Sequence, residues 1–422
     1  MRRLFGTDGV RGVVGEELTE ELVEMLGRAF ARWSSGAGVL VGRDTRASGP
    51  TLERALASGL ASGGSDVALG GVLPTPAVAL LADEGGAVVS ASHNPAAYNG
   101  VKLFDRGWKL EDADEEAIEA LLDDEGEAGS PGAVAEAGGL TKRYVDLVCE
   151  RFGAPLAGLR VVLDCANGAM VEAAPAAFAR LGAEITVVGD APDGTNINDG
   201  CGATDLSLLA SVVPCTAADL GLAFDGDGDR MLAVDAEGKE VDGDQILAIL
   251  ALHLRVDLVA VTQMTNLGFH RLMSERGVRV LTTEVGDRYV LEALRAERGV
   301  LGGEQSGHVL YLDGHTTGDG LVAGLLLCRA VREGESALAE LAAAMPRFPQ
   351  MKANVPLRGK ALPASVDAEV ARLVGELDGR GRALVRPSGT EPVVRILTEA
   401  ETEEEARRLC GTIRSLVTRE LG

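Results

Sequence analysis

Short apolar runs alternate with stretches of helical periodicity along most of the chain. Three runs, at 38–44, 159–164 and 258–262, are rich in Val and Leu, end in a polar or glycine-rich turn, and precede an amphipathic segment. This pattern is typical of buried parallel strands in βα units. Because the runs recur at intervals of roughly 100 residues, they predict three similar α/β domains rather than one large sheet.

Helical spacing of apolar residues predicts helices at 18–34, 52–62, 140–152, 171–181, 244–254 and 319–333. Beyond a proline-flanked segment at 346–349 the pattern changes. It predicts strands at 351–357, 382–385 and 393–399 and helices at 365–377 and 403–416. The predicted fold class is therefore α/β, with three similar mixed-sheet α/β domains (1–151, 152–238 and 239–347) and a smaller C-terminal α+β domain (348–422).

Composition narrows the classes of partner. The chain has 422 residues, 46% hydrophobic and 25% charged, which is a globular balance, and its formal net charge is −24. Such a charge disfavours binding to nucleic acid or anionic membranes. The acidic residues are partly concentrated at 111–127, a stretch that we expect to form a solvated helix face and a linker. No apolar run approaches the ~18 residues of a membrane span, and the N-terminal segment reaches Gly6 and Asp8 before an apolar signal stretch could form. These features disfavour a membrane protein or an exported one.

The cysteines and histidines indicate the redox compartment and bear on whether the chain binds zinc. The six cysteines are scattered with no C-x-x-C pair, and none of the five histidines has the spacing of a zinc site. This usage predicts buried structural thiols in a reducing compartment and makes zinc improbable.

The strongest chemical motif is D-G-D-G-D-R at 225–230, directly after the apolar run 220–224. Three carboxylates at alternate positions, separated by glycines, can converge on a hard divalent cation. An EF-hand loop is excluded because its sixth and twelfth positions would be Arg230 and Ala236 rather than Gly and Glu. A solvated acidic turn is disfavoured because three charges after a buried strand repel one another, so Mg²⁺ is the expected ligand.

Ser92, in V-S-A-S-H-N-P at 89–95, follows another apolar run and is a nucleophile candidate. The alternative is a hydroxyl that caps a turn. The G-x-S-x-G pattern of serine hydrolases is absent here, and His93, as the next residue, is poorly placed to act as its base.

Two further loops fit a phosphorylated sugar. G-G-E-Q-S-G-H at 302–308 offers polar groups between glycines for a polyhydroxylated ligand, although the motif taken alone favours an ordinary polar surface turn. R-P-S-G-T-E-P at 386–392, with Arg395, can form a phosphate receptacle or a charged β-turn. Nucleotide P-loop and dinucleotide fingerprints are absent. A serine, a Mg²⁺ site, a polyol loop and a phosphate clamp together indicate phosphoryl transfer on a sugar phosphate.

The chain resembles the α-D-phosphohexomutases, and within them the bacterial phosphoglucosamine mutase branch, almost from end to end. Besides the four motifs above, the resemblance rests on F-G-T-D-G-V-R-G (5–12), D-C-A-N-G-A (164–169), P-D-G-T-N-I-N (192–198), V-D-G-D-Q (241–245), V-G-D-R-Y (285–289) and T-T-G-D-G (316–320). It implies three α/β domains and a smaller C-terminal domain around a central cleft.

The resemblance also implies roles for individual residues. Ser92 would be the phosphoserine that donates and regains the phosphoryl group. One Mg²⁺ per chain would be held by Asp225, Asp227, Asp229 and an oxygen of phospho-Ser92. The reaction centre would be lined by Arg11, His93, Lys102, Arg230 and His308, with Lys102 or His308 as the acid/base. The sugar hydroxyls would bind Glu304 and Ser306, and the phosphate that does not react would bind Arg386, Ser388, Gly389, Thr390 and Arg395.

The implied reaction interconverts glucosamine 6-phosphate and glucosamine 1-phosphate, with glucosamine 1,6-bisphosphate as intermediate and activator. It would serve cytoplasmic UDP-N-acetylglucosamine and cell-wall synthesis. Gln305 supports the glucosamine branch because a neutral amide can accept a hydrogen bond from the 2-ammonium group. The alternatives are a phosphomannomutase/phosphoglucomutase, a metal-dependent phosphatase and a non-catalytic sugar-phosphate-binding protein. The oligomeric state stays open, with a homodimer as one option.

Overall fold

The computed structural model describes residues 4–6, 8–123, 130–357, 362–388 and 392–421. The chain forms two compact units. The first contains residues up to 264 together with 278–343, and the second contains 265–277 and the segment from 344 onward. None of the helices in the described part of the chain combines the length and apolar character that a bilayer-spanning segment needs.

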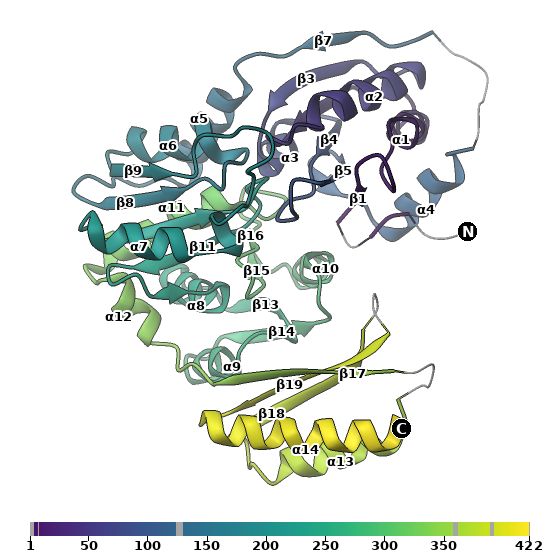
Figure 1. Ribbon diagram of the computed structural model, residues 1–422. Coiled ribbons are helices and arrows are strands. Elements are labelled where there is room, and N and C mark those ends of the chain that lie inside the picture. Colours follow the sequence, from purple (N-terminus) through teal and green to yellow (C-terminus); the bar gives the residue numbers. More distant parts are fainter. Residues whose placement is uncertain (1–3, 7, 124–129, 358–361, 389–391, 422) are drawn as a thin grey trace. The chain divides into compact units, whose positions relative to one another are not determined.

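The first sheet of the larger unit has the order β1-β5-β4-β2-β3-β7, with β6 paired to β5. Its strands are β1 (Val10–Val13), β2 (Val39–Arg43), β3 (Val67–Val72), β4 (Gly85–Val89), β5 (Tyr98–Asp105), β6 (Trp108–Lys109) and β7 (Val134–Glu136). The helices in this part of the chain are α1 (Glu20–Trp33), α2 (Gly49–Ser62), α3 (Thr75–Leu81), α4 (Asp112–Ala120) and α5 (Leu140–Phe152). Figure 1 shows α1 and α2 side by side.

The second sheet has the order β12-β11-β10-β8-β9 and the third has the order β14-β13-β15-β16. The second sheet and its helices comprise β8 (Arg160–Asp164), α6 (Met170–Arg180), β9 (Glu184–Val188), the 3₁₀ turn Gly202–Thr204, α7 (Ser207–Cys215), β10 (Leu220–Phe224), β11 (Met231–Asp235) and β12 (Glu240–Val241). The third comprises α8 (Gly243–Leu254), β13 (Leu258–Thr262), β14 (Arg279–Thr283), α10 (Asp287–Glu297), β15 (Leu301–Gly303), β16 (Val309–Tyr311), α11 (Gly320–Gly334) and α12 (Leu338–Ala343).

The three apolar runs singled out in the sequence become the central strands β2, β8 and β13 of three separate sheets. Each pairs in parallel with both of its neighbours. A strand with parallel neighbours on both sides and helices on the sheet faces is buried, so it is apolar throughout. The prediction of three α/β domains is confirmed, and the boundaries given above remain our proposal.

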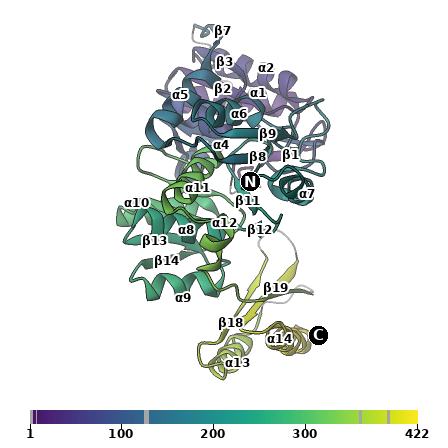
Figure 2. The same ribbon diagram turned by 90° about the vertical axis from the view of Figure 1, so that its left-hand side faces the viewer.

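The C-terminal unit has a three-stranded antiparallel sheet in the order β17-β19-β18. Its elements are α9 (Leu267–Glu275), β17 (Gln350–Pro356), α13 (Ala364–Gly375), β18 (Gly381–Pro387), β19 (Val393–Ala400) and α14 (Glu403–Leu421). Figures 1 and 2 both show α13 and α14 on one face of this sheet. Val394 and Ile396 of β19 and Ile413 of α14 belong to the buried core between them, which confirms the predicted α+β domain.

Two details differ from the sequence prediction. The acidic stretch 111–127, expected to be a solvated helix face and linker, begins with α4, in which Glu115 is buried and pairs with Arg288 at 2.5 Å. Residues 124–129 of that stretch lie outside the described residues. Of the six cysteines, Cys215 is exposed while the other five are buried as expected.

Candidate active site

The serine predicted as nucleophile lies just beyond the C-terminal end of β4. Its backbone has φ of +52°, a left-handed conformation that costs a non-glycine residue of order 1–3 kcal/mol. The Ser92 N–H donates to Oγ of Ser90 at 2.9 Å, and the Ser92 carbonyl accepts from Nδ2 of Asn198 at 3.0 Å. These two hydrogen bonds hold the strained backbone of Ser92 in place and so fix the direction of its hydroxyl.

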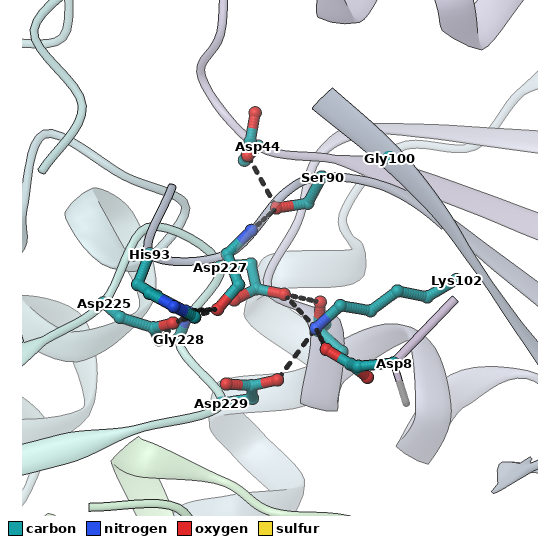
Figure 3. A network of polar contacts seen from close by, with 12 residues as sticks. Asp8, Asp44, Ser90, His93, Gly100, Lys102, Asp225, Asp227, Gly228 and Asp229 are labelled. Carbon is teal, nitrogen blue, oxygen red and sulfur yellow. Dashed lines mark hydrogen bonds and ion pairs between the residues drawn. The ribbon is translucent and has the colours of Figure 1, made fainter. Parts of the chain in front are cut away.

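Arg46 is fully buried and holds the same loop from the other side. Its guanidinium donates to the carbonyls of Ser92 (2.9 Å), Asn94 (2.8 Å), Pro95 (2.5 Å) and Tyr98 (3.0 Å). Nε of Arg46 pairs with Oδ2 of Asp44 at 2.8 Å, and Ser90 Oγ donates to the same oxygen at 2.6 Å. A buried charge is tolerated only when paired and hydrogen-bonded, and this one is paired with Asp44 and bonded to four carbonyls. Figure 3 shows Asp44 and Ser90 beside the site.

The D-G-D-G-D-R loop follows β10, and its three carboxylates converge. One oxygen each of Asp225, Asp227 and Asp229 lies within 4.8 Å of the others, and all three residues are buried. The Ser92 hydroxyl donates to Oδ2 of Asp225 at 2.5 Å. A Cβ at Gly226 would lie 2.6 Å from the Ser92 carbonyl oxygen, so only glycine allows this approach of the two loops. The nucleophile candidate and the metal-ligand candidates thus form one site.

Lys102 of β5 lies between these carboxylates (Figure 3). Nζ contacts Oδ2 of Asp227 at 2.7 Å, Oδ2 of Asp229 at 2.8 Å and Oδ2 of Asp8 at 2.8 Å. Burial alone would lower the pKa of Lys102, but the three carboxylates hold it well above its usual value. Burial would likewise raise the pKa of Asp229, yet Lys102 holds it well below the ordinary range. The Lys102 ammonium and the Asp229 carboxylate are therefore charged together.

The residues present fit a divalent cation in addition to Lys102. Lys102 occupies the Oδ2 atoms of Asp227 and Asp229, while the buried Oδ1 of Asp227 has no hydrogen-bond partner among the described residues. Burial and the carboxylates of Asp229 and Asp227 raise the pKa of Asp225 to about 8, which is the expected response of a third carboxylate lacking its own counter-charge. Three convergent carboxylate oxygens are the donor set that Mg²⁺ and Ca²⁺ prefer.

His308 closes the site from the third sheet. It lies between Asp229 (Nδ1–Oδ1, 3.5 Å) and Asp287 (Nε2–Oδ2, 3.4 Å). Burial would lower the pKa of His308, but Asp229 and Asp287 raise it above its usual value. Lys109 also pairs with Asp287 and, at 2.6 Å, with Asp8, so basic and acidic side chains alternate from Lys102 to His308.

Gly318 packs against the ring of His308, and we expect its substitution to impair catalysis. A Cβ at this position would lie 2.4 Å from the imidazole, so Gly318→Ala must displace His308 from Asp229 and Asp287. A displacement of about 1 Å at a reacting group can cost on the order of 100-fold in rate. We expect kcat to fall by roughly 10- to 100-fold in steady-state assays.

The matched control is Gly334→Ala at the end of α11, where the nearest neighbour of a new Cβ is a Leu341 methyl at 4.0 Å. A Gly318→Ala enzyme with the kcat of the Gly334→Ala enzyme would contradict a role for the His308 position.

Two arginines and His93 complete the reaction centre predicted from the sequence. Burial, Arg230 and Arg11 lower the pKa of His93 to about 4, so its ring is neutral near pH 7. His93 Nδ1 lies 3.3 Å from the Ser92 hydroxyl, farther than the Asp225 oxygen. Arg11 pairs with Asp8, and Arg230 Nε lies 3.8 Å from Asp229 Oδ1. The structure thus gathers Arg11, His93, Lys102, Arg230 and His308 around Ser92 and the triad.

The predicted sugar loop joins β15 to β16 beside this centre. Glu304 Oε1 accepts from the Gly286 N–H at 3.2 Å. Together with Asp229 and Asp225, Glu304 raises the pKa of Arg230. Ser306 Oγ is buried without a hydrogen-bond partner among the described residues. Gln305 Nε2 donates to Asp244 Oδ2 at 3.2 Å.

The predicted phosphate clamp belongs to the C-terminal unit. Arg386 of β18 and Arg395 of β19 are directly opposite each other in the antiparallel register, and the Ser388 N–H donates to the Val393 carbonyl at 2.8 Å. Like charges paired across strands are destabilising without an anion nearby. Gly389 and Thr390 lie outside the described residues.

Several residues of the site escaped sequence reasoning. Asp8, Asn198 and Asp287 stand inside motifs quoted for the resemblance, and Asp44 ends the apolar run 38–44, but none of these four was given a role. Arg46, Thr75 and Lys109 lie outside every motif considered. A polar residue just after a buried strand was the signal for Asp44 and Arg46. Thr75, in L-P-T-P, and Lys109 carry no signal that single-sequence reasoning could have used.

Comparisons with known proteins agree with this geometry. Family models described as phosphoglucomutase/phosphomannomutase match four successive segments: alpha/beta/alpha domain I at 2–129, domain II at 142–238, domain III at 242–348 and the C-terminal domain at 329–416. The structure of a phosphoglucomutase/phosphomannomutase family protein from Burkholderia thailandensis superposes with a TM-score of 0.83 at 27% identity, covering 100% of this chain and 97% of that one.

Curated relatives are closer in sequence. The chain is 47% identical to phosphoglucosamine mutase of Pelotomaculum thermopropionicum, over 98% of both chains. It is 49% identical to phosphoglucosamine mutase of Streptomyces griseus, over the full length of both. The chain therefore belongs to the phosphoglucosamine mutases of the phosphoglucomutase/phosphomannomutase family and is an enzyme of the mutase type of isomerase.

Proposed function

We propose that this enzyme interconverts glucosamine 6-phosphate and glucosamine 1-phosphate through phospho-Ser92 and glucosamine 1,6-bisphosphate. The observation that carries the proposal is the hydrogen bond from the Ser92 hydroxyl to Asp225 inside a buried carboxylate triad that Lys102 partly neutralises. The names of the relatives support the substrate. We further propose that the enzyme is cytoplasmic and supplies UDP-N-acetylglucosamine synthesis.

Two phosphoryl transfers of opposite sense make up the proposed reaction. The O1 hydroxyl of glucosamine 6-phosphate attacks the phosphorus of phospho-Ser92, so the bond from phosphorus to O1 forms, the bond to Ser92 Oγ breaks, and the O1 proton passes to a base. The departing Ser92 Oγ takes up a proton. The bisphosphate then turns around, and Ser92 Oγ attacks the phosphorus on O6: the bond from phosphorus to Oγ forms, the bond to O6 breaks, the Oγ proton passes to a base and O6 takes up a proton. This leaves glucosamine 1-phosphate and phospho-Ser92. Phosphoryl transfer of this kind depends on positioning and charge neutralisation.

The side chains around Ser92 divide this work. We propose that Arg11, Arg230 and Lys102 neutralise the negative charge on the transferring phosphoryl group. A lysine whose pKa is held well above its usual value by three carboxylates is a poor base. His308 is the better acid/base candidate, since an imidazole of raised pKa can give and take a proton near neutral pH. His93, neutral and close to Ser92, is assigned to positioning.

Asp225, Asp227 and Asp229, with an oxygen of phospho-Ser92, would hold one Mg²⁺ per chain. When bound, the cation supplies positive charge to the phosphoryl oxygens. Glu304 and Ser306 would bind sugar hydroxyls; the buried Ser306 hydroxyl, which has no hydrogen-bond partner in the described part of the chain, is available for this. Arg386, Ser388, Gly389, Thr390 and Arg395 would bind the phosphate that is not reacting.

Gln305 supports an amino sugar as substrate. Its Nε2 donates to Asp244, which leaves the amide oxygen as the acceptor that a 2-ammonium group requires.

The test is ³¹P NMR of the Mg²⁺-loaded enzyme mixed with glucosamine 6-phosphate and a trace of its 1,6-bisphosphate, with glucose and mannose 6-phosphates in parallel. We expect glucosamine 1-phosphate to form much faster than the other 1-phosphates. Faster turnover of glucose or mannose phosphate would keep the mechanism and change the substrate. Release of inorganic phosphate alone would indicate a phosphatase and would refute the proposal.

A further inference from the structure

Thr75 makes two contacts with the central residue of the carboxylate triad. It begins α3, is fully buried, and belongs to no motif considered above. Its hydroxyl donates to Oδ2 of Asp227 at 2.5 Å, and its backbone N–H donates to the carbonyl oxygen of Asp227 at 2.9 Å. A single threonine therefore holds both the main chain and the side chain of Asp227.

The contact determines which oxygen of Asp227 stays available. Oδ2 accepts from both Thr75 and Lys102, at 2.5 and 2.7 Å, whereas Oδ1 has no hydrogen-bond partner in the described part of the chain. With two donors on one oxygen, the carboxylate cannot rotate without losing both bonds. Lys102 alone would fix it less well, because the same ammonium also contacts Asp8 and Asp229.

Thr75 also connects two sheets of the larger unit. Thr75 follows β3. Two residues before it, the Leu73 N–H donates to the carbonyl of Arg43 at the end of β2. Strand β2 pairs with β4, and Ser92 lies just beyond the end of β4. Asp227 follows β10 of the second sheet. The hydrogen bond from Thr75 thus links the Asp227 carboxylate to the framework that carries the nucleophile.

We infer that Thr75 is a positioning residue for the cation: its hydroxyl orients the Asp227 carboxylate so that Oδ1 faces the site of the divalent metal. The inference rests on the metal site of the proposed function. Outer partners that orient metal ligands typically contribute 10- to 100-fold in metal affinity. Thr75 is assigned no contact with the sugar or the phosphoryl group.

The experiment compares Thr75→Val, which keeps the shape of the side chain and removes the hydroxyl, with Thr75→Ser, which keeps the hydroxyl. Binding of Mn²⁺ alone to metal-free protein is measured by electron paramagnetic resonance, with each sample's Ser92 phosphorylation checked by intact mass. We expect the dissociation constant for Mn²⁺ to rise about 10- to 100-fold in Thr75→Val and to stay near the parent value in Thr75→Ser. At saturating metal, kcat and the KM for the sugar phosphate should return close to the parent values.

Thr398→Val is the matched control. Thr398 is also fully buried, and its hydroxyl donates to the Ala406 carbonyl at 2.8 Å in the C-terminal unit. Its loss should leave Mn²⁺ affinity unchanged. Parent-like Mn²⁺ affinity in Thr75→Val, or an equal loss in Thr398→Val, would overturn the inference while leaving the metal site intact. A parent protein that binds no Mn²⁺ would instead refute the metal site itself, and with it this inference.

Discussion

Ser92→Ala should lose turnover of glucosamine 6-phosphate by at least about 10³-fold, the largest effect we expect from any single substitution. The variant lacks the oxygen that carries the phosphoryl group between the two transfers. It also lacks the hydrogen bond that the Ser92 hydroxyl donates to Asp225, which is 2.5 Å long in the parent protein. Alanine can take the same left-handed backbone at a cost similar to that of serine, so the fold should persist.

Two measurements separate lost chemistry from lost structure. Intact mass after incubation with a 1,6-bisphosphate should show one added phosphoryl group on the parent and none on Ser92→Ala. The control is Ser65→Ala, which removes another buried serine hydroxyl, one without a hydrogen-bond partner in the described residues. It should retain both turnover and phosphorylation. Parent-like turnover in Ser92→Ala would eliminate the phosphoserine mechanism.

Lys102→Met should destabilise the metal-free protein and also abolish most activity. The ammonium contacts Asp8, Asp227 and Asp229 at 2.7–2.8 Å and is only 2% exposed. Removing one partner of a buried ion pair leaves uncompensated charge, which costs roughly 3–5 kcal/mol. Asp8 keeps Lys109 and Arg11, so the uncompensated charge falls mainly on the metal loop.

Thermal unfolding in chelator, then in added Mg²⁺, measures this effect. The melting temperature of Lys102→Met should fall clearly in chelator and recover in part with Mg²⁺, because a cation bound to the folded state replaces some of the lost charge. Unpaired buried carboxylates bind protons more tightly when folded than when unfolded, so the deficit should shrink as the pH is lowered from 8 to 6.

Lys142→Met provides the matched comparison. Lys142 also pairs with an aspartate, Asp146, at 2.7 Å, but its side chain is 80% exposed. Exposed pairs contribute about 0–1 kcal/mol, so its melting temperature should barely change. Equal melting temperatures for the two variants in chelator would mean that Lys102 does not stabilise the triad.

Much of the fold could be predicted because local pattern and burial agree. The predicted strand at 258–262 coincides with β13, and the predicted helix at 140–152 coincides with α5. Boundaries shifted by a few residues elsewhere; the last helix, predicted to end at 416, continues to Leu421. Its final turn buries Val417 and Leu421 in the core of the C-terminal unit. This tertiary packing stabilises the end of the helix, and the periodicity of apolar residues does not reveal it.

The acidic stretch shows where local reasoning failed. Charged residues along a helix usually face solvent, and the sequence around Glu115 contains no sign of a partner. The partner, Arg288, is 173 residues away in the chain and lies in the first turn of α10, in a different domain. Glu115 can be buried only because Arg288 lies close to it in space. The residues near Glu115 in sequence therefore could not reveal its burial.

The chemical groups of the candidate site could be predicted from contiguous motifs, since each motif has its own local geometry. Three alternating aspartates must converge after a buried strand, and Ser92 must stand at a turn. How these groups are held depends on contacts between distant parts of the chain: Lys102 lies between the carboxylates, Arg46 donates to the serine loop, and Thr75 donates to Asp227. The physical reason is that a buried charge or hydroxyl must find its partner within hydrogen-bond distance, and folding supplies that partner from any part of the chain.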